Sequence, residues 1–448
     1  MTDTITTFAE KLQELFYDFP SIFSEESAFI LRNRLLDIQK WLFTSLNWIT
    51  QSNPTLGSLA ALFDNQRISI TKQALSKKFD MSCVKFLRKL LAEILRTLVN
   101  SSNAKAPPLL SLFTKVFIAD CTRLQLSQQT KDFFPGVGGN KENVNASELK
   151  IFLRIEATTG IIDQFLYDSG RTSDHAFYKR ALPLPKHSLE LADMGFLSQE
   201  RMLYNQKNSI YYICRIQSQS IIYYNNQKYS ISEFLLHQKG SKIDVHVLLG
   251  KRKVPCRLLG RKVSEEVAKQ KLANVTRKAQ KERRPVSQAQ VIVSKWQFYV
   301  TNIESDMCTF DEIIILYSVR WQIELIFKLW KKEMNLNKSN GKTTARVLCE
   351  KLLKMINILI FHSHEILADI GPVCEVSHVE VLDRYKVHFT SLLEALYKHR
   401  SIRTIVRIVR DIVKFIRDTP KRCKRKKERY TYDLLQNRQI NQTNMEFS

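Results

Sequence analysis

The hydrophobic period of the sequence changes at Pro107-Pro108, and this change constrains the fold more than any other feature. Before it, apolar residues recur every three to four positions in AFILRNRLLDIQKWLFTSL and KFLRKLLAEILRTLV, a spacing typical of amphipathic helices. After it come short apolar runs, LFTKVFIADCTRLQL and ELKIFLRIEATTGIIDQFLYDSG, which predict strands. The chain therefore combines a helical N-terminal region, residues 1–105, with a sheet, and its fold class is α+β or α/β.

The expected elements beyond Pro108 indicate how the sheet is ordered. Three strands come first, HAFYKRAL then supplies a helix, and SLELADMGFLS and SIYYICRIQ supply two further short strands. Strand, strand, strand, helix, strand is the element order of a ribonuclease H-like sheet. We therefore expect residues 106–205 to form the first part of such a mixed-sheet core.

A second block of strands follows in residues 206–301. Four of its segments are strand candidates: IIYYNNQKYSISEFLL, SKIDVHVLLG, VPCRLLGRKV and VIVSKWQFYVTNI. This block predicts a β-strand insertion domain that interrupts the core. Helical periodicity then returns, so we expect residues 302–372 to complete the core and residues 373–448 to form a basic helical C-terminal region.

One segment of the N-terminal region has the spacing of a helix-turn-helix. In TLGSLAALFDNQRISITKQALSKKFD, Leu59, Leu62 and Phe63 share one helical face, and Ser69 or Thr71 is suited to cap a second helix. A DNA-binding helix-turn-helix has this spacing, but so does a small helical bundle that packs on the rest of the protein. The sequence leaves both interpretations open.

The charge balance is strongly basic, with 69 Lys and Arg against 44 Asp and Glu and a formal net charge of +25. Most of the surplus lies in residues 251–285 and 400–429, each with 13 basic and 3 acidic residues. Two separate basic clusters fit a long DNA track better than one small acidic ligand. The alternatives are an anionic membrane surface and a soluble protein whose charged faces are only solvated.

The cysteines and the N-terminus indicate a reduced compartment. None of the eight cysteines forms a C-x-x-C pair, so neither a zinc module nor a disulfide framework is expected. The N-terminus lacks the basic and apolar stretches of a signal peptide. The apolar stretch 355–361 is far shorter than the ~20 residues that a membrane span needs. We therefore expect a cytoplasmic protein that does not enter a membrane.

Two acidic residues follow apolar strand segments. Asp120 ends VFIAD and Asp193 ends LELAD. At the carboxyl edge of a strand, a carboxylate can be half desolvated and still open to a cleft. An aspartate in this position is also a common turn or cap residue, so neither Asp120 nor Asp193 is specific on its own.

A third acid has a far more specific context, YSVRWQIELIFKLWKK. If this segment is one continuous helix, a polar stripe falls within an arc of roughly 80°. The stripe consists of Tyr317, Arg320, Glu324, Lys328 and Lys331, and the apolar face of Val319, Ile323, Ile326 and Trp330. An amphipathic surface helix with a Glu324–Lys328 pair would also produce a charged stripe. However, a carboxylate among phosphate-binding donors is what metal-assisted phosphoryl chemistry requires.

The spacing Tyr317-x2-Arg320-x3-Glu324-x6-Lys331 resembles the signature of bacterial insertion-sequence transposases of the Asp-Asp-Glu (DDE) class. The resemblance implies a ribonuclease H-like core with a β insertion, and Asp120, Asp193 and Glu324 as the catalytic, metal-binding acids. Glu324 follows Asp193 by 131 positions, a gap that suits a core interrupted by an inserted domain. In such enzymes a tryptophan near the end of the insertion stacks on a flipped base, and Trp296 has the similar position here. A core tryptophan on a strand is the other interpretation.

The resemblance also implies the reaction and its partners. Two Mg²⁺ ions, for which Mn²⁺ can substitute, would be held by the three acids during cleavage of the element end and its transfer to target DNA. Tyr317, Arg320, Lys328 and Lys331 would bind the DNA phosphates. The partners would be double-stranded DNA, as terminal repeats and target, and a second copy of the chain in a synaptic homodimer. The protein would then be bacterial, cytoplasmic and associated with the nucleoid when bound.

Two rival functions remain open at this point. A ribonuclease H-like endonuclease would hydrolyse nucleic acid without strand transfer. A catalytically inactive DNA-binding protein derived from a transposase would bind element ends without cutting them. A protein that uses its basic C-terminus at a membrane surface is less well supported, because no amphipathic segment offers a strongly hydrophobic anchor.

Overall fold

The computed structural model divides the chain into two compact units, which we describe separately. Unit 1 comprises Met1–Lys105, Cys121–Thr172 and Gln322–Tyr432, and unit 2 comprises Ala106–Asp120, Ser173–Trp321 and Asp433–Ser448. The residues that the structure describes are 2–30, 36–97, 102–137, 147–193, 195–196, 198–216, 219–238, 240–421 and 431–436. The basic run from 422 to 429 lies outside them. The five-part division expected from the sequence stays a prediction.

Unit 1 consists mainly of helices, and the expected helical N-terminal region is confirmed. Its first helices are α1 (Thr2–Gln13), the π-helix Glu14–Asp18, α2 (Phe19–Glu26), α3 (Ile38–Ile49), α4 (Leu56–Asp64), α5 (Lys72–Lys78) and α6 (Met81–Thr97). Its later helices are α13 (Trp321–Lys332, from its second residue), α14 (Thr344–Leu367), α15 (His378–Tyr397) and α16 (Ile402–Arg417). It also contains the antiparallel strands β2 (Ser147–Glu156) and β3 (Ile162–Ser169).

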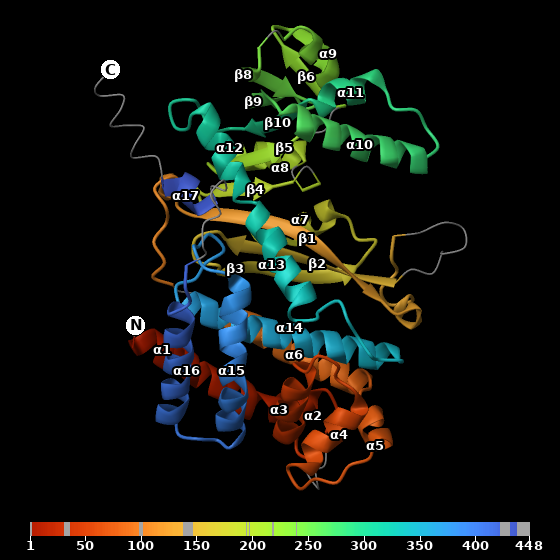
Figure 1. The fold of residues 1–448 in the computed structure, drawn as a ribbon, viewed down its shortest axis with the longest axis vertical. Helices are drawn as coiled ribbons and strands as arrows, with labels where there is room; N and C mark the ends of the chain where they lie inside the picture. Colours follow the sequence, from red (N-terminus) through yellow and green to blue (C-terminus); the bar gives the residue numbers. More distant parts are fainter. Residues whose placement is uncertain are drawn as a thin grey trace. The chain divides into compact units, whose positions relative to one another are not determined.

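Helix α14 forms the centre of unit 1, because every residue from Val347 to Leu367 is buried. A helix that is covered on all sides must be surrounded by other elements. Helices α3, α6 and α16 contact it, and Figure 1 shows α6 alongside it. The N-terminal helices have an aromatic core of their own, in which the ring centroids of Phe29 and Trp41 are 4.8 Å apart.

Helices α4 and α5 form the expected pair. Thr71 caps α5, because its hydroxyl accepts a hydrogen bond from the backbone N–H of Ala74 at 3.2 Å. Leu59 and Phe63 are fully buried, and the indole N–H of Trp48 in α3 donates to the carbonyl of Thr55 at 2.8 Å. The apolar faces therefore pack inward, and the choice between a DNA-binding module and a packing bundle remains open.

Unit 2 is built on a mixed sheet. Its strands are the first part of β1 (Val116–Leu126), β4 (Leu189–Ala192), β5 (Tyr211–Arg215), β6 (Ile221–Tyr224), β7 (Gln227–Ser230), β8 (Lys242–Leu249), β9 (Val254–Lys262) and β10 (Trp296–Thr301). Within unit 2 the order is β1-β4-β5-β10-β9-β8-β6-β7. The pairs β1–β4 and β4–β5 are parallel, and the remaining neighbours are antiparallel.

Helices complete unit 2. They are α7 (Asp174–Arg180), α8 (Gln199–Lys207), α9 (Ile231–Leu236), α10 (Glu265–Lys281), α11 (Gln288–Ser294), α12 (Phe310–Ser318) and, shared with unit 1, α17 (Thr431–Gln436). The mixed α/β class with helical terminal regions is confirmed. The more specific ribonuclease H-like assignment stays a prediction at this stage.

Two segments expected as strands are helical in the structure. ISEFLL forms α9 and QAQVIVS forms α11, so only Trp296–Thr301 of the last candidate segment is a strand. Both helices begin with a capping box, in which a serine and a residue three positions on bond each other's backbone N–H. Ser230 pairs with Glu233 in α9, and Ser287 pairs with Gln290 in α11. These caps satisfy the first helical N–H groups and favour helix over the strand that the apolar runs suggested.

In the described part of the chain, no helix is both long enough and apolar enough to cross a membrane.

We predict that His364 makes unit 1 sensitive to acid. Its ring is fully buried on α14, and burial lowers its pKa to about 4. The unfolded chain gains a proton near pH 6.5, whereas the folded chain does so only near pH 4, so stability is lost as pH falls through this window. Replacing His364 by Leu should remove about 2 kcal/mol of the stability difference between pH 7 and pH 5.

Urea unfolding of the wild type and of His364→Leu at pH 7, 6 and 5 measures this contribution. A further pair of measurements at pH 8 and pH 9 is the internal control, because His364 is neutral there in both states. Equal loss of stability by the two proteins on acidification would contradict the prediction.

Candidate active site

Parallel pairing of β1 and β4 places two of the expected acids at the same level of the sheet. Ile118 of β1 is the register partner of Leu191 of β4. Two residues further along each strand lie Asp120 and Asp193, so continuation of the register brings them opposite each other at a strand spacing of about 4.8 Å. Asp193 directly follows β4, as expected. Asp120 does not end its strand, because β1 continues to Leu126.

A guanidinium group neutralises Asp120. The Nη1 atom of Arg320 donates to Oδ2 of Asp120 at 3.0 Å, and the two side chains are 10% and 20% exposed. A charge-assisted bond in a half-buried position is stronger than a surface ion pair. Arg320, one of the expected phosphate-binding residues, is therefore bonded directly to an expected catalytic acid.

The signature segment is not the single continuous helix that we expected. Helix α12 ends at Ser318 and α13 begins at Trp321. Between them, the backbone N–H groups of Val319 and Arg320 bond the carbonyls three residues earlier, at 3.1 Å each, which is a tighter turn than an α-helix. The single 80° arc therefore does not hold across the segment, and Arg320 is presented from the turn instead of from a helical face.

Tyr317, at the end of α12, is buried beside these groups. It is 5% exposed, and its hydroxyl has no hydrogen-bond partner among the described residues. Burial raises the pKa of Tyr317, and the carboxylate of Asp193 raises it further against the opposing effect of Arg320. The phenol therefore stays protonated at neutral pH and is a hydrogen-bond donor, as a phosphate contact requires.

Two further cations of unit 2, Arg215 and Lys271, were not identified from the sequence. The guanidinium of Arg215, at the end of β5, lies 5.7 Å from the centre of the Tyr317 ring. Lys271 of α10 donates to the carbonyl of Trp296 at 3.0 Å, and burial and the charge of Arg215 lower its pKa. Arg215 follows the apolar run YYIC in the way that Asp120 and Asp193 follow theirs, which is the signal that could have identified it.

Trp296 occupies the first position of β10 and is 5% exposed. Its ring stacks on Phe298 at 5.9 Å, and Nζ of Lys262 lies 5.4 Å from its centre. The indole is therefore covered by protein in this structure, as a core tryptophan would be. Its use as a base-stacking residue stays a prediction.

The rest of the signature lies on α13, in unit 1. Glu324, Lys328 and Lys331 are at least partly exposed and recur at helical spacing, so they share one face. The opposite face is buried and contains Ile323, Ile326, Phe327 and Trp330. Trp330 packs against Phe165 of β3, with ring centroids 6.3 Å apart. Asp120 and Asp193 belong to unit 2, so the structure brings those two acids together and describes Glu324 separately.

The donor chemistry of this site suits a hard divalent cation. Carboxylate oxygens are the ligands that Mg²⁺ and Mn²⁺ prefer, and Asp120 already attracts one cationic group, the guanidinium of Arg320. Among the residues that the structure describes, no group of three carboxylate, imidazole or thiol side chains is close enough together to hold an ion. A divalent ion at this site would therefore need Asp120, Asp193 and a further ligand.

Comparison with known proteins decides the family. The model of the transposase DDE domain matches residues 111–360, which include Asp120, Asp193 and Glu324. This chain belongs to the DDE transposase family. The transposase is 25% identical over 403 residues to the transposase of insertion sequence IS1151 from Clostridium perfringens, with 84% of each chain covered. It is 24% identical to that of IS231F from Bacillus thuringiensis subsp. israelensis, covering 81% of this chain and 80% of the relative.

The resemblance inferred from the signature is thereby confirmed. The chain is a DNA-cleaving and DNA-transferring enzyme, and DNA is its partner. The family generally uses a divalent metal ion, in agreement with the carboxylate donors. The matched region also extends across the β-rich block of residues 206–301, whose assignment as an insertion domain stays a prediction.

A buried polar network holds the end of the signature helix in unit 1. Lys351 donates to the carbonyls of Leu336 and Lys338 at 2.6 and 3.0 Å, and Lys354 to those of Asn335 and Lys338 at 2.8 Å each. Burial and the neighbouring Lys354 lower the pKa of Lys351 to about 7, and burial lowers that of Lys354 to about 8. The amino groups of these two lysines thus bind the loop that follows α13.

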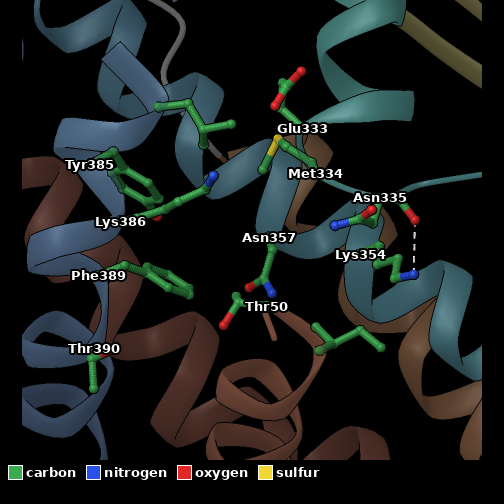
Figure 2. Close-up of a pocket in the computed structure, with 12 residues that line it drawn as sticks. Thr50, Glu333, Met334, Asn335, Lys354, Asn357, Tyr385, Lys386, Phe389 and Thr390 are labelled. Atoms are coloured by element: carbon green, nitrogen blue, oxygen red, sulfur yellow. Dashed lines mark hydrogen bonds between the residues drawn. The ribbon is translucent and has the colours of Figure 1, made fainter. Parts of the chain in front are cut away.

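Glu350 binds the next part of the same loop. Its Oε2 accepts from the Ser339 hydroxyl at 2.7 Å and from the N–H groups of Asn340 and Gly341 at 2.8 and 3.2 Å, while Arg346 bonds Oε1 at 2.9 Å. Figure 2 shows the cavity of about 180 Å³ beside this loop, with Lys354 bonded to Asn335. These α14 residues position the C-terminal end of the helix that bears Glu324 and Lys331.

We predict that Glu350→Gln loosens this loop. The amide keeps the volume of the carboxylate but loses its charge and part of its accepting capacity, so the free energy of unfolding should fall by about 2–4 kcal/mol. Hydrogen–deuterium exchange of residues 335–343 should accelerate at the same time. Glu333→Gln, at an exposed position of the same loop, is the matched control and should change neither quantity. Unchanged exchange in Glu350→Gln would contradict a positioning role for Glu350.

Proposed function

We propose that this transposase binds the ends of its own insertion sequence, cuts them, and joins them to target DNA. Asp120, Asp193 and Glu324 are the catalytic acids in this proposal. The observation that carries it is the register of β1 and β4, whose continuation puts Asp120 opposite Asp193. Both aspartates lie in the region matched by the family model. The core is of the ribonuclease H-like type, as the parallel β1–β4–β5 pairing supports.

Chain connectivity supports the assignment of Glu324 as the third acid. Arg320, which binds Asp120, precedes Glu324 by four residues, and the intervening residues 321–323 are helical. One turn of helix rises about 6 Å over four residues, so Glu324 is tied closely to the residue that contacts Asp120. As long as α13 is intact, Glu324 therefore stays close to Arg320.

The three carboxylates would hold two Mg²⁺ ions, with Mn²⁺ as a possible replacement. Bound there, divalent ions supply Lewis-acid polarisation of the scissile phosphate and stabilise the charge of in-line displacement. The protein's own groups bind and orient the DNA. Arg320 offers a planar fork to a phosphate, Lys328 and Lys331 supply point charges from one face of α13, and Tyr317 donates from its hydroxyl.

The rest of the chain would bind DNA and a second protomer. The exposed basic residues of α10, such as Lys269, Arg277 and Lys278, suit contacts to phosphates along a duplex. The pair α4–α5 is proposed to contact the element end, and Trp296 to stack on a displaced base once it is uncovered. Two ends must be held together, so we propose a homodimer that acts in the cytoplasm, on the bacterial nucleoid.

Removing any one of the three acids should abolish cleavage and leave DNA binding intact. For Asp120→Asn, Asp193→Asn and Glu324→Gln we expect strand cleavage of a labelled terminal-repeat duplex, with Mg²⁺, to fall on the order of 10³-fold or more. Affinity for the same duplex in a gel-shift assay should change less than about threefold. Asp306→Asn, at an exposed position before α12, is the control. Full cleavage by any of the three variants would refute the assignment.

Strand transfer distinguishes a transposase from a nuclease with the same core. Given a pre-cut element end with a free 3′-hydroxyl and a supercoiled plasmid, the protein should produce joined molecules in Mg²⁺. A nuclease would yield only nicked or shortened DNA. A protein that binds the ends but neither cuts nor joins them would instead be an inactive derivative.

A further inference from the structure

A second constellation of reactive side chains lies in unit 1, outside the residues assigned to DNA chemistry. It consists of Cys374 in the segment before α15, His378 at the start of α15 and Glu365 near the end of α14. The Sγ atom of Cys374 lies 3.7 Å from Nε2 of His378. The Nδ1 atom of the same ring lies 2.6 Å from Oε1 of Glu365. Thiol, imidazole and carboxylate are therefore arranged in series.

The proton positions in this series follow from the hydrogen-bond partners. Nδ1 of His378 faces a carboxylate oxygen, which only accepts, so Nδ1 carries a proton. Glu365 is 3% exposed and also contacts Nδ1 of His362 at 3.3 Å, while Nε2 of His362 donates to the carbonyl of Gly160 at 2.7 Å. Nδ1 of His378 therefore donates to the carboxylate, and this bond fixes the His378 ring so that Nε2 points to the thiol.

The charges of the pair agree with this geometry. Burial alone would raise the pKa of Glu365, but the charge of His378 and the hydrogen bonds of both histidines lower it. Burial alone would lower the pKa of His378, but Glu365 and Cys374 raise it well above its ordinary value. An anionic Glu365 therefore supports a cationic His378 beside the sulfur, and a neighbouring imidazolium favours a thiolate.

Cys374 differs in accessibility from most other cysteines of the described residues. Five are buried: Cys83, Cys214, Cys256, Cys308 and Cys349. Burial raises the pKa of the Cys256 thiol to about 12, and buried thiols of this kind are inert. Cys374 and Cys121 are partly exposed, and the Cys374 sulfur lies within reach of the His378 imidazole.

We propose that Cys374 is a covalent modification site, a nucleophilic thiol activated by His378 and oriented through Glu365, that reacts with small soft electrophiles and low-molecular-weight disulfides. With a disulfide, the Cys374 sulfur forms a new S–S bond as the original S–S bond breaks, and the leaving thiolate takes the proton from Nε2 of His378. One disulfide and one thiol are consumed, and one mixed disulfide and one thiol are formed. This site is independent of the proposed strand-transfer chemistry.

Two ion pairs involve the chain segment that contains Cys374. Glu375, the next residue, forms an ion pair with Lys421. Asp369, at the start of the same segment, pairs with Arg417 of α16 at 2.9 Å. Each of these pairs offsets its own charges, and the imidazole of His378 is the titratable group whose contact with the Cys374 sulfur the structure shows.

The pH dependence of alkylation in the wild type tests the proposal without any variant. The full-length protein is treated with iodoacetamide between pH 6 and pH 9, and the modification of each cysteine is followed by peptide mass spectrometry. An ordinary thiol with pKa near 8.5 loses about fiftyfold in rate between pH 8.5 and pH 6.5. For Cys374 we expect less than about a fivefold loss. An ordinary fiftyfold loss, or faster reaction at Cys121, would overturn the proposal.

Variants test whether His378 activates the Cys374 thiol. His378→Gln should slow alkylation of Cys374 at pH 6.5 by about tenfold or more and restore the ordinary pH dependence, while Cys374→Ser should abolish the adduct. His388→Gln, ten residues further along α15, is the matched control and should leave the rate unchanged. Glutathione disulfide, used in place of iodoacetamide, should give a mixed disulfide at Cys374. An unaltered rate in folded His378→Gln would refute the role of the imidazole.

Discussion

Parallel pairing between β1 and β4 is the constraint on which the candidate active site depends. Because side chains in neighbouring parallel strands advance in step, a single register fixes Asp120 and Asp193 opposite each other. A shift of one residue would turn one of the two aspartates to the other face of the sheet. The apolar neighbours of both aspartates, Ile118 and Leu191 among them, are fully buried, and their burial stabilises this register over its alternatives.

Much of the site could be predicted from the sequence because its residues follow recognisable patterns. Asp120 and Asp193 each come after a run of apolar residues, and Glu324 lies in a motif whose spacing is highly specific. The break between α12 and α13 could not be predicted, because Val319 and Arg320 are compatible with a helix and the tighter turn is set by tertiary contacts. One of these contacts is the bond from Arg320 to Asp120, 200 residues away in the sequence.

The fold shows the same division between local and distant causes. Helical periodicity indicated the helical character of residues 1–105 and of α16, because an amphipathic face determines both the pattern and the packing. Periodicity did not predict α9 and α11, because an apolar run as short as ISEFLL suits a strand equally well. In both segments a capping box favours the helix. The sequence analysis did not predict the buried charges of α14. Glu350, Lys351 and Lys354 have no distinguishing spacing, and they bind backbone atoms of the loop that precedes the helix.

The tight turn at Val319 and Arg320 has a consequence for how the signature can vary. Each residue of an α-helix advances its direction by 100°, so one residue added or removed at this turn would rotate the face bearing Glu324, Lys328 and Lys331 by about that angle relative to α12. The buried face of Ile323 and Trp330 would rotate with it and lose its packing. The packing of α13 therefore sets the number of residues between Tyr317 and Glu324.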